Sequence, residues 1–177
     1  LSDANRKLLE AAAQTHLQTG LAIAVHTGAN TAAASEQLAI LEKVGVMPSA
    51  WIWIHAHQVN EPEVLVAFAQ RGAWISLDSW NAALAAKNLE ALRQLKAADL
   101  LHRVLLSHDG NLFPAPGAKA RPIDWLLREG RAVLTKAGFT DDEWQQLTTR
   151  NPALAYAISV KHVTSASESP RRMKSRF

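Results

Sequence analysis

The sequence contains no cysteine among its 177 residues. Disulfide bonds and thiolate metal sites are therefore excluded, and any metal ion must be held by histidine nitrogens and carboxylate oxygens. The seven histidines and sixteen acidic residues supply such ligands in excess.

Long apolar runs are also missing. No stretch approaches the roughly 20 apolar residues of a membrane span, and residues 1–20 lack the uncharged stretch of a signal peptide. No phosphate-cradling Gly-x-Gly-x-x-Gly motif follows a predicted strand, which argues against nucleotide binding. The sequence thus indicates neither a membrane protein nor a nucleotide-binding module.

A basic surface is absent as well. The net charge is +3, but four cations lie in the last seven residues, and the rest of the chain is close to neutral. A nucleic-acid partner is therefore not indicated. The chain begins at Leu1 without a methionine, so any N-terminal signal would lie upstream, and the localisation stays unknown, with the cytoplasm favoured.

What the sequence does contain is a fourfold alternation of helix-like and strand-like segments, typical of parallel βαβ units. The expected helices cover residues 3–19, 32–44, 61–71 and 86–98, and the expected strands cover residues 21–26, 51–55, 73–78 and 103–109. A loop at residues 110–122 and three helices at about 122–137, 141–148 and 152–158 follow. We expect an α/β barrel in which active-site residues lie at the carboxyl ends of the strands.

Each expected strand ends in a side chain that can bind a metal ion or a proton: His26, His55, Asp78 and Asp109. Taken singly, each has a structural explanation, such as a hydrogen-bonded strand-end histidine or an aspartate that caps a turn. Three of them in register, His26, His55 and Asp109, favour a metal site, because zinc needs imidazoles and carboxylates that converge from different strands.

Four motifs resemble the phosphotriesterase-like family of the amidohydrolase superfamily. They are Ala22-Ile-Ala-Val-His-Thr27, Arg71-Gly-Ala-Trp-Ile-Ser-Leu-Asp78, Leu106-Ser-His-Asp109 and Asn151-Pro-Ala-Leu-Ala-Tyr156, which are similar to the fifth, seventh and eighth strands and the terminal helix of that family. The resemblance covers about residues 1–158. A complete barrel needs about 250 residues, so the resemblance implies only the C-terminal half, with about four βα units.

This resemblance implies a metal-dependent hydrolase with a binuclear site, and zinc is the expected metal. His26 and His55 would hold one ion, Asp109 would help to hold the other and accept the proton of the attacking water, and a bridging hydroxide would attack a lactone, carboxyl ester or organophosphate. The spacing from His55 to Gly72 matches the family without a gap, so His55 is expected to be the ligand rather than His57.

The remaining candidates are a second group. His57 is expected near the ligands or the substrate, because strand positions i and i+2 share one face, although an exposed loop position fits equally well. Asp78 is a substrate-side or relay carboxylate or a loop cap, and Trp80 is expected to line an apolar substrate pocket. His108 is expected to point away from Asp109 as a packed residue.

Several family features are absent: the His-x-His pair of the first strand, the bridging carboxylated lysine of the fourth, and a histidine or arginine after Asp78, where Ser79 stands. We therefore expect residues 1–158 to form half of a barrel and residues 159–177 to form a disordered, basic, Ser-rich tail. His16, His102 and His162 are expected on the surface.

Two alternatives stay open. One is a catalytically inert barrel fragment that acts, if at all, through assembly with another chain or as a homo-oligomer. The other is an open, flavodoxin-like binding module, which fits the alternation of elements but does not explain the strand-end histidines.

Overall fold

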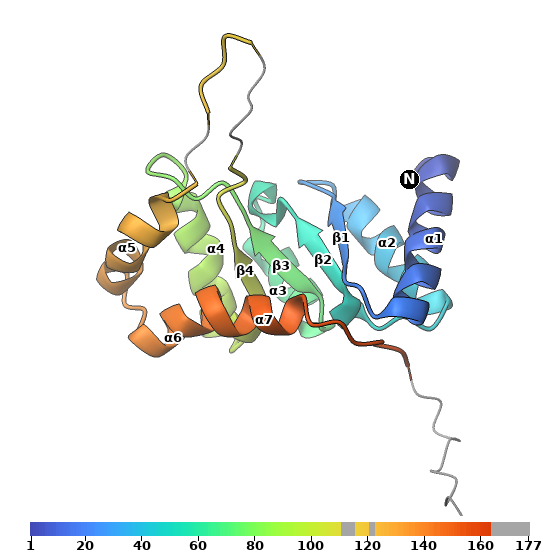
Figure 1. Cartoon of the computed structure of the whole chain (residues 1–177). Coiled ribbons are helices and arrows are strands. Elements are labelled where there is room, and N and C mark those ends of the chain that lie inside the picture. The colour runs from blue at the N-terminus through green and yellow to red at the C-terminus, as the bar shows by residue number, and fades with distance from the viewer. Residues whose placement is uncertain (111–115, 121–122, 164–177) are drawn as a thin grey trace, which may run out of the picture.

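The fold is an α/β arrangement around one parallel sheet, seen here in a computed structural model that describes residues 1–110, 116–120 and 123–163 (Figure 1). The strands are β1 (Ile23–His26), β2 (Trp51–Ile54), β3 (Trp74–Leu77) and β4 (Val104–Leu106), and they pair in that order. The helices between them are α1 (Asp3–Thr19), α2 (Thr31–Lys43), α3 (Pro62–Gln70) and α4 (Ala85–Ala97). The expected alternation and the parallel sheet are therefore confirmed.

The two faces of the sheet carry different apolar sets, because successive side chains of a strand point to opposite sides. Ile23, Trp51 and Ile75 belong to the large core that also contains residues of α1–α4. On the other face Ile52, Trp74 and Leu105 pack with Ala155. Helix α7 (Asn151–Ala155) crosses this second face (Figure 1).

The tryptophans of β2 join the sheet to α3, as the sequence predicts. The ring of Trp53 lies 4.8 Å from that of Phe68 in a T-shaped contact, and the ring of Trp51 lies 6.1 Å from it. Both tryptophans are fully buried, so this pair of edge and tilted contacts anchors the second βα unit.

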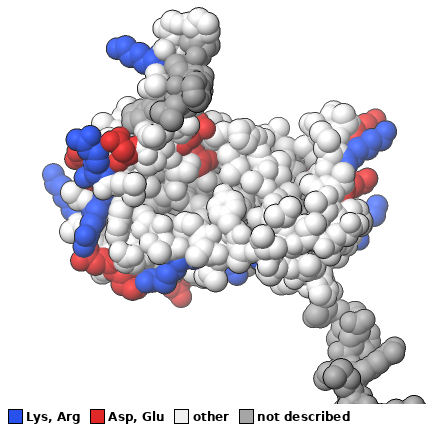
Figure 2. Space-filling model, in the orientation of Figure 1, with Lys and Arg blue, Asp and Glu red and all other residues white. Residues whose placement is uncertain are grey.

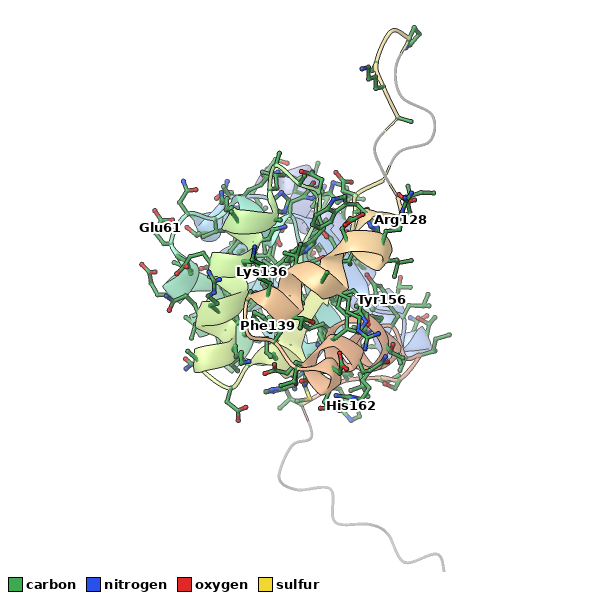
Figure 3. All side chains as sticks on the ribbon, turned by 90° about the vertical axis from the view of Figure 1, so that its left-hand side faces the viewer. Glu61, Arg128, Lys136, Phe139, Tyr156 and His162 are labelled. Atoms are coloured by element: carbon green, nitrogen blue, oxygen red, sulfur yellow. The ribbon has the colours of Figure 1, made fainter. Side chains whose placement is uncertain are left out.

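The C-terminal helices differ from the expected three separate segments. A π-helical stretch at Leu126–Gly130 runs into α5 (Arg131–Lys136). Then α6 (Asp141–Gln145), a π-helical stretch at Gln146–Arg150 and α7 follow one another without a break. The π turn ends at Arg150, two residues before Pro152, whose nitrogen has no hydrogen to donate to an α-helical bond. In the end-on view, α5 and α6, which flank Phe139, cover the end of the molecule next to α4 (Figure 3).

The second face of the sheet is nearly free of charge. In Figure 2, lysine, arginine and acidic side chains gather at the two ends of the molecule, and few lie between them over the face that α7 crosses. Depletion of charge is typical of the centre of a protein interface. Figure 3 shows Tyr156 on the side opposite Glu61, and Tyr156 is 55% exposed on this uncharged face.

Residues 159–163 do not behave as the start of a free tail. Ser159 N–H donates to the Gly20 carbonyl over 3.1 Å, Met47 N–H to the Lys161 carbonyl over 2.9 Å, and Val163 N–H to the Gly45 carbonyl over 2.9 Å. The segment therefore adds an extended strap to the amino end of the sheet. The rest of the predicted tail, residues 164–177, lies outside the described residues.

His16 is buried rather than exposed, which makes the surface prediction wrong. Its Nδ1 lies 2.7 Å from the Leu21 carbonyl, and its Nε2 accepts a hydrogen bond of 2.9 Å from Lys161 N–H. His16 follows Leu9 and Ala13 at helical spacing, so it belongs to the buried face of α1. The Leu9–Ala13–His16 spacing could have revealed this.

We expect Gly20→Ala to loosen this strap and to destabilise the protein by about 2–4 kcal/mol. Gly20 has φ +74°, and an added Cβ would lie 2.6 Å from Ser159 N. Chemical denaturation gives the free energy of unfolding. Gly138→Ala is the matched control, since Gly138 has φ +87° but no atom within 4 Å of its Cβ position, and it should lose only about 1 kcal/mol. Equal losses in the two variants would contradict the close approach.

Candidate metal centre

Titratable side chains from all four strands meet at one rim of the sheet. His26 ends β1, His55 follows β2, Asp78 follows β3, and Asp109 comes three residues after β4. Parallel strands carry their carboxyl ends to the same edge. A cavity of about 510 Å³ opens there, and its lining residues are His55, His57, Gln58, Ser79, Trp80, Asn81, Leu84, His108 and Asp109.

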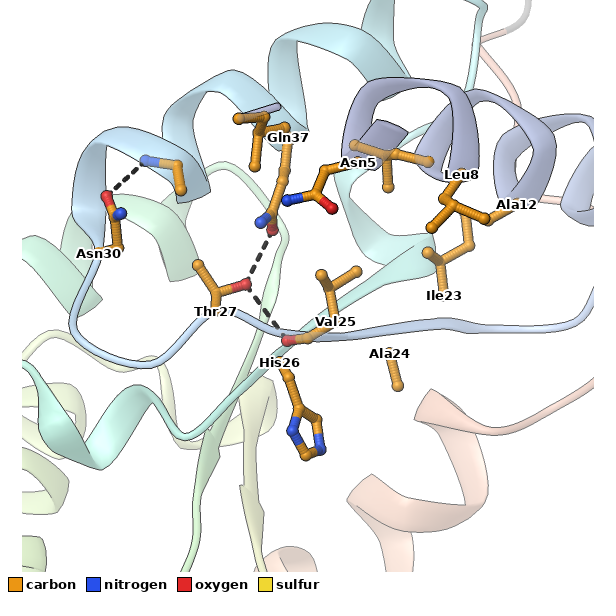
Figure 4. Close-up of a pocket in the computed structure, with 13 residues that line it drawn as sticks. Asn5, Leu8, Ala12, Ile23, Ala24, Val25, His26, Thr27, Asn30 and Gln37 are labelled. Atoms are coloured by element: carbon orange, nitrogen blue, oxygen red, sulfur yellow. Dashed lines mark hydrogen bonds between the residues drawn. The ribbon is translucent and has the colours of Figure 1, made fainter. Parts of the chain in front are cut away.

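His26 reaches this rim from the face of β1 that points away from α1 and α2. Figure 4 shows Ile23 and Val25 turned toward α1 and α2, and His26 pointing to the opposite side of the strand. The rings of His26 and His55 are 4.5 Å apart in a T-shaped contact. The structure therefore brings together the two histidines that the sequence assigns to one ion.

A larger cavity of about 650 Å³ lies along β1, between α1 and α2 (Figure 4). Among its lining residues only His26 has a titratable side chain. Thr27 also lines this cavity, and its hydroxyl donates a hydrogen bond of 2.8 Å to Gln37 Oε1. The smaller cavity is the candidate site despite its size, because His55, His57, His108 and Asp109 line it.

The turn after β2 places both histidines of His55-Ala56-His57 at the cavity, although not for the predicted reason. His55 is left-handed, with φ +64°, and Ala56–Gln58 form a 3-10 turn, so strand alternation ends at Ile54. The two rings lie 5.8 Å apart at 90°. His57 is buried, which excludes the exposed-loop interpretation.

The carboxylate of Asp78 is the shared hydrogen-bond acceptor, or hub, of this rim. Its Oδ1 accepts hydrogen bonds from the hydroxyls of Ser76 and Ser107 over 2.6 and 2.7 Å, and its Oδ2 accepts one from His55 N–H over 2.6 Å. The His55 Nδ1 lies 3.2 Å from the same Oδ2, outside the geometry of a formed hydrogen bond. One buried carboxylate thus ties together the ends of β2, β3 and β4.

The main chain of Asp78 completes the hub. Its N–H donates to His57 Nδ1 over 3.3 Å, and its carbonyl accepts from Asn88 Nδ2 over 3.0 Å. These bonds link the rim to α4, which carries Asn88. The sequence motif located Asp78, but nothing in the sequence indicated these partners.

Burial favours the neutral form of His57 and of His108. It lowers the pKa of His57, an effect to which His55 and Lys87 add, while Asp78 and Asp109 oppose it. Burial also lowers the pKa of His108, against the charge of Asp124. Neutral imidazole is the form that binds metal ions.

His108 and Trp80 both border the cavity. β4 ends at Leu106, so strand alternation does not fix the orientation of His108 relative to Asp109, and both residues line the cavity. The Nε2 of His108 accepts a hydrogen bond of 2.8 Å from Leu126 N–H. Trp80 is 1% exposed and stacks on Trp125 at 6.5 Å. Of the loop between His108 and Trp125, the structure describes residues 109–110, 116–120 and 123–124.

The donor set fits a divalent ion. Potential ligand atoms of His55, His57 and Asp78 lie within 4.8 Å of one another. This group differs from the predicted set of His26, His55 and Asp109. Asp109 lies at the same cavity, with φ +49° and its N–H 3.3 Å from Ser107 Oγ, to which it donates. A ligand set of imidazoles and carboxylates without thiolates suits zinc and similar ions.

The family follows from comparison of the sequence. The sequence model of the Phosphotriesterase family matches residues 1–155. The chain belongs to this family. Over 79 residues, which are 44% of this chain and 23% of its relative, it is 32% identical to the N-acetyltaurine hydrolase of Mus musculus.

Solved phosphotriesterase structures share the fold. The phosphotriesterase homology protein of Escherichia coli, complexed with phosphate in its active site, matches with a TM-score of 0.74 and 26% identity over 86% of this chain and 53% of that chain. The phosphotriesterase of Mycobacterium tuberculosis matches with a TM-score of 0.75 and 19% identity over 89% and 52%. This phosphotriesterase-family chain therefore spans about half the length of these relatives. No helix among its described residues is long and apolar enough to cross a membrane.

Proposed function

We propose that the chain forms strands five to eight of a phosphotriesterase-family barrel and contributes to a metal-dependent hydrolase. The observation that carries this proposal is the meeting of His26, His55, His57, Asp78 and Asp109 at the carboxyl ends of four parallel strands. The coverage of about half of each solved relative supports the assignment to half a barrel. The face of the sheet that α7 crosses is nearly free of charge, which suits packing against the other half.

In this proposal His26 and His55 hold one ion, and Asp109 helps to hold a second ion. A divalent ion, with zinc expected, lowers the pKa of water and polarises the bond under attack. Asp109 accepts the proton of the attacking water, and Asp78 holds the His55 backbone in place through the hydrogen bond from its N–H. Trp80 lines the substrate side of the cavity.

The substrate is proposed to be a small molecule with an ester-like bond: a lactone, a carboxyl ester or a phosphotriester. These share an electrophilic centre that hydroxide can attack. The mouse relative adds N-acetyltaurine as a compound to test. The competing proposal is a catalytically inert barrel fragment that acts through assembly with another chain.

We expect purified residues 1–177 with added zinc to show little or no turnover of these substrates. Four strands leave the edges of β1 and β4 unpaired, and three ligands cannot hold two ions at the separation of a shared hydroxide. Hydrolysis assays combined with sedimentation test this expectation. Robust turnover by a monomer, abolished by Asp109→Ala, would show that the half-barrel proposal is wrong.

A second hydrolysis experiment combines residues 1–177 with the N-terminal half of the Escherichia coli relative. We expect a one-to-one complex that hydrolyses at least one of the substrates, and we expect Asp109→Ala to abolish this turnover. A complex that sediments as expected but hydrolyses none of them would favour the inert fragment instead.

A further inference from the structure

The two histidines of the turn after β2 use different ring nitrogens. His57 Nδ1 accepts a hydrogen bond from Asp78 N–H, so this nitrogen carries a lone pair and no hydrogen. In a neutral imidazole the other nitrogen then carries the hydrogen. The Nε2 of His57 is therefore an N–H donor, at a residue that lines the cavity.

His55 has the opposite arrangement. Its Nδ1 lies 3.2 Å from Asp78 Oδ2, which also accepts from the His55 N–H. A lone pair on Nδ1 would face a carboxylate oxygen and be repelled, whereas an N–H is attracted to it. The hydrogen therefore sits on Nδ1, and the Nε2 lone pair stays available for a metal ion, as in the carboxylate–histidine–metal arrangements of known sites.

From this pair of tautomers, and resting on the proposed function, we infer that His57 is a substrate-binding donor and not a metal ligand. Its Nε2–H would hydrogen-bond the carbonyl or phosphoryl oxygen of the substrate, on which negative charge grows as hydroxide attacks. The hydrogen stays on Nε2 throughout, so no proton is transferred. Fixed donors of this kind contribute about 10²–10³-fold to turnover.

The competing arrangement is a cation held between His55, His57 and Asp78, whose ligand atoms lie close enough together. That cation would compete with hydrogen bonds that the cluster already makes. His57 Nδ1 would have to release Asp78 N–H, and the carboxylate of Asp78 already accepts three hydrogen bonds. The hydrogen bonds of the cluster therefore favour a supporting role for Asp78 and a donor role for His57.

The first test reads the tautomers in the metal-free chain by long-range ¹H–¹⁵N NMR of ¹⁵N-labelled histidine, with His55→Gln and His57→Gln used for assignment. We expect the hydrogen on Nε2 of His57 and on Nδ1 of His55. Added zinc should then shift the Nε2 resonance of His55 and leave the protonation pattern of His57 unchanged. A hydrogen on Nδ1 of His57, or zinc bound to either of its nitrogens, would overturn the inference.

The second test compares two variants. The amide nitrogen of His57→Gln takes about the place of Nε2 and retains a donor, whereas His57→Phe has none. We expect the zinc affinity of both to stay within about threefold of the parent, because the ligands are untouched. In a complex that hydrolyses substrate, His57→Phe should lose about 10²–10³-fold in kcat, and His57→Gln should lose less than about tenfold. Loss of zinc affinity in both variants, or equal losses of kcat, would contradict the donor role.

Failure of the proposed function leaves a different signature. A chain that binds no zinc and hydrolyses nothing, but shows the expected tautomers, would refute the metal-dependent hydrolase. It would also refute the substrate role of His57, although the hydrogen-bond assignment would stand.

Discussion

Replacement of Asp78 by alanine is expected to remove about 3–5 kcal/mol from the free energy of unfolding. The variant would leave the hydroxyls of Ser76 and Ser107 and the N–H of His55 without their buried acceptor. Each buried group left unpaired costs about 1–3 kcal/mol. The carboxylate also joins three strand ends, so its loss loosens the whole rim. Urea or guanidinium denaturation measures the effect.

Two other variants bracket this result. Asp78→Asn keeps the volume and an acceptor for the serines but turns an amide N–H₂ or oxygen toward His55, and it should lose less than Asp78→Ala. Asp142→Ala is the matched surface control, because the carboxylate of Asp142 is 80% exposed and pairs with Arg150. Exposed pairs contribute about 0–1 kcal/mol. If Asp78→Ala and Asp142→Ala unfolded at the same denaturant concentration, the hub assignment would be refuted.

Loss of the His55 side chain is expected to abolish stoichiometric zinc binding. The ring lies between His26 and Asp78 at the centre of the rim, so His55→Ala removes the ligand on which the first ion depends. We expect at least about a 100-fold loss of zinc affinity, more than the 10–100-fold typical of removing the partner of a ligand. His26→Ala and Asp109→Ala should also weaken binding. Elemental analysis and zinc titration measure these changes.

His102→Ala controls for general effects of removing a histidine, since His102 is exposed on the 3-10 turn before β4. Its zinc stoichiometry should equal that of the parent chain. Unchanged stoichiometry in the His26, His55 and Asp109 variants would refute the ligand assignment.

Local patterns predicted the elements well. Ser2 caps α1 through a hydrogen bond to Asn5 N–H, and Gly20 ends that helix with φ +74°, so the boundaries at residues 3 and 19 agree with the prediction. The apolar runs before His26 and His55 formed parallel strands, because only a sheet covered on both faces tolerates such runs. The predictions were less successful where side-chain partners outside the segment decide the outcome, as at His16 and in the helices after Asp141.

The sequence by itself determined the alternation of elements, the family, and the identity of the residues that reach the rim, since the end of a parallel strand fixes where its last side chain lies. Only the tertiary structure decided how those residues are oriented and which hydrogen-bond partners they have. The left-handed turn at His55, the end of β4 before His108, and the hydrogen bonds of Asp78 depend on contacts between strands 20–30 residues apart. Hydrogen-bond partners choose the tautomer of an imidazole, and a linear pattern carries no information about which partner lies 3 Å away.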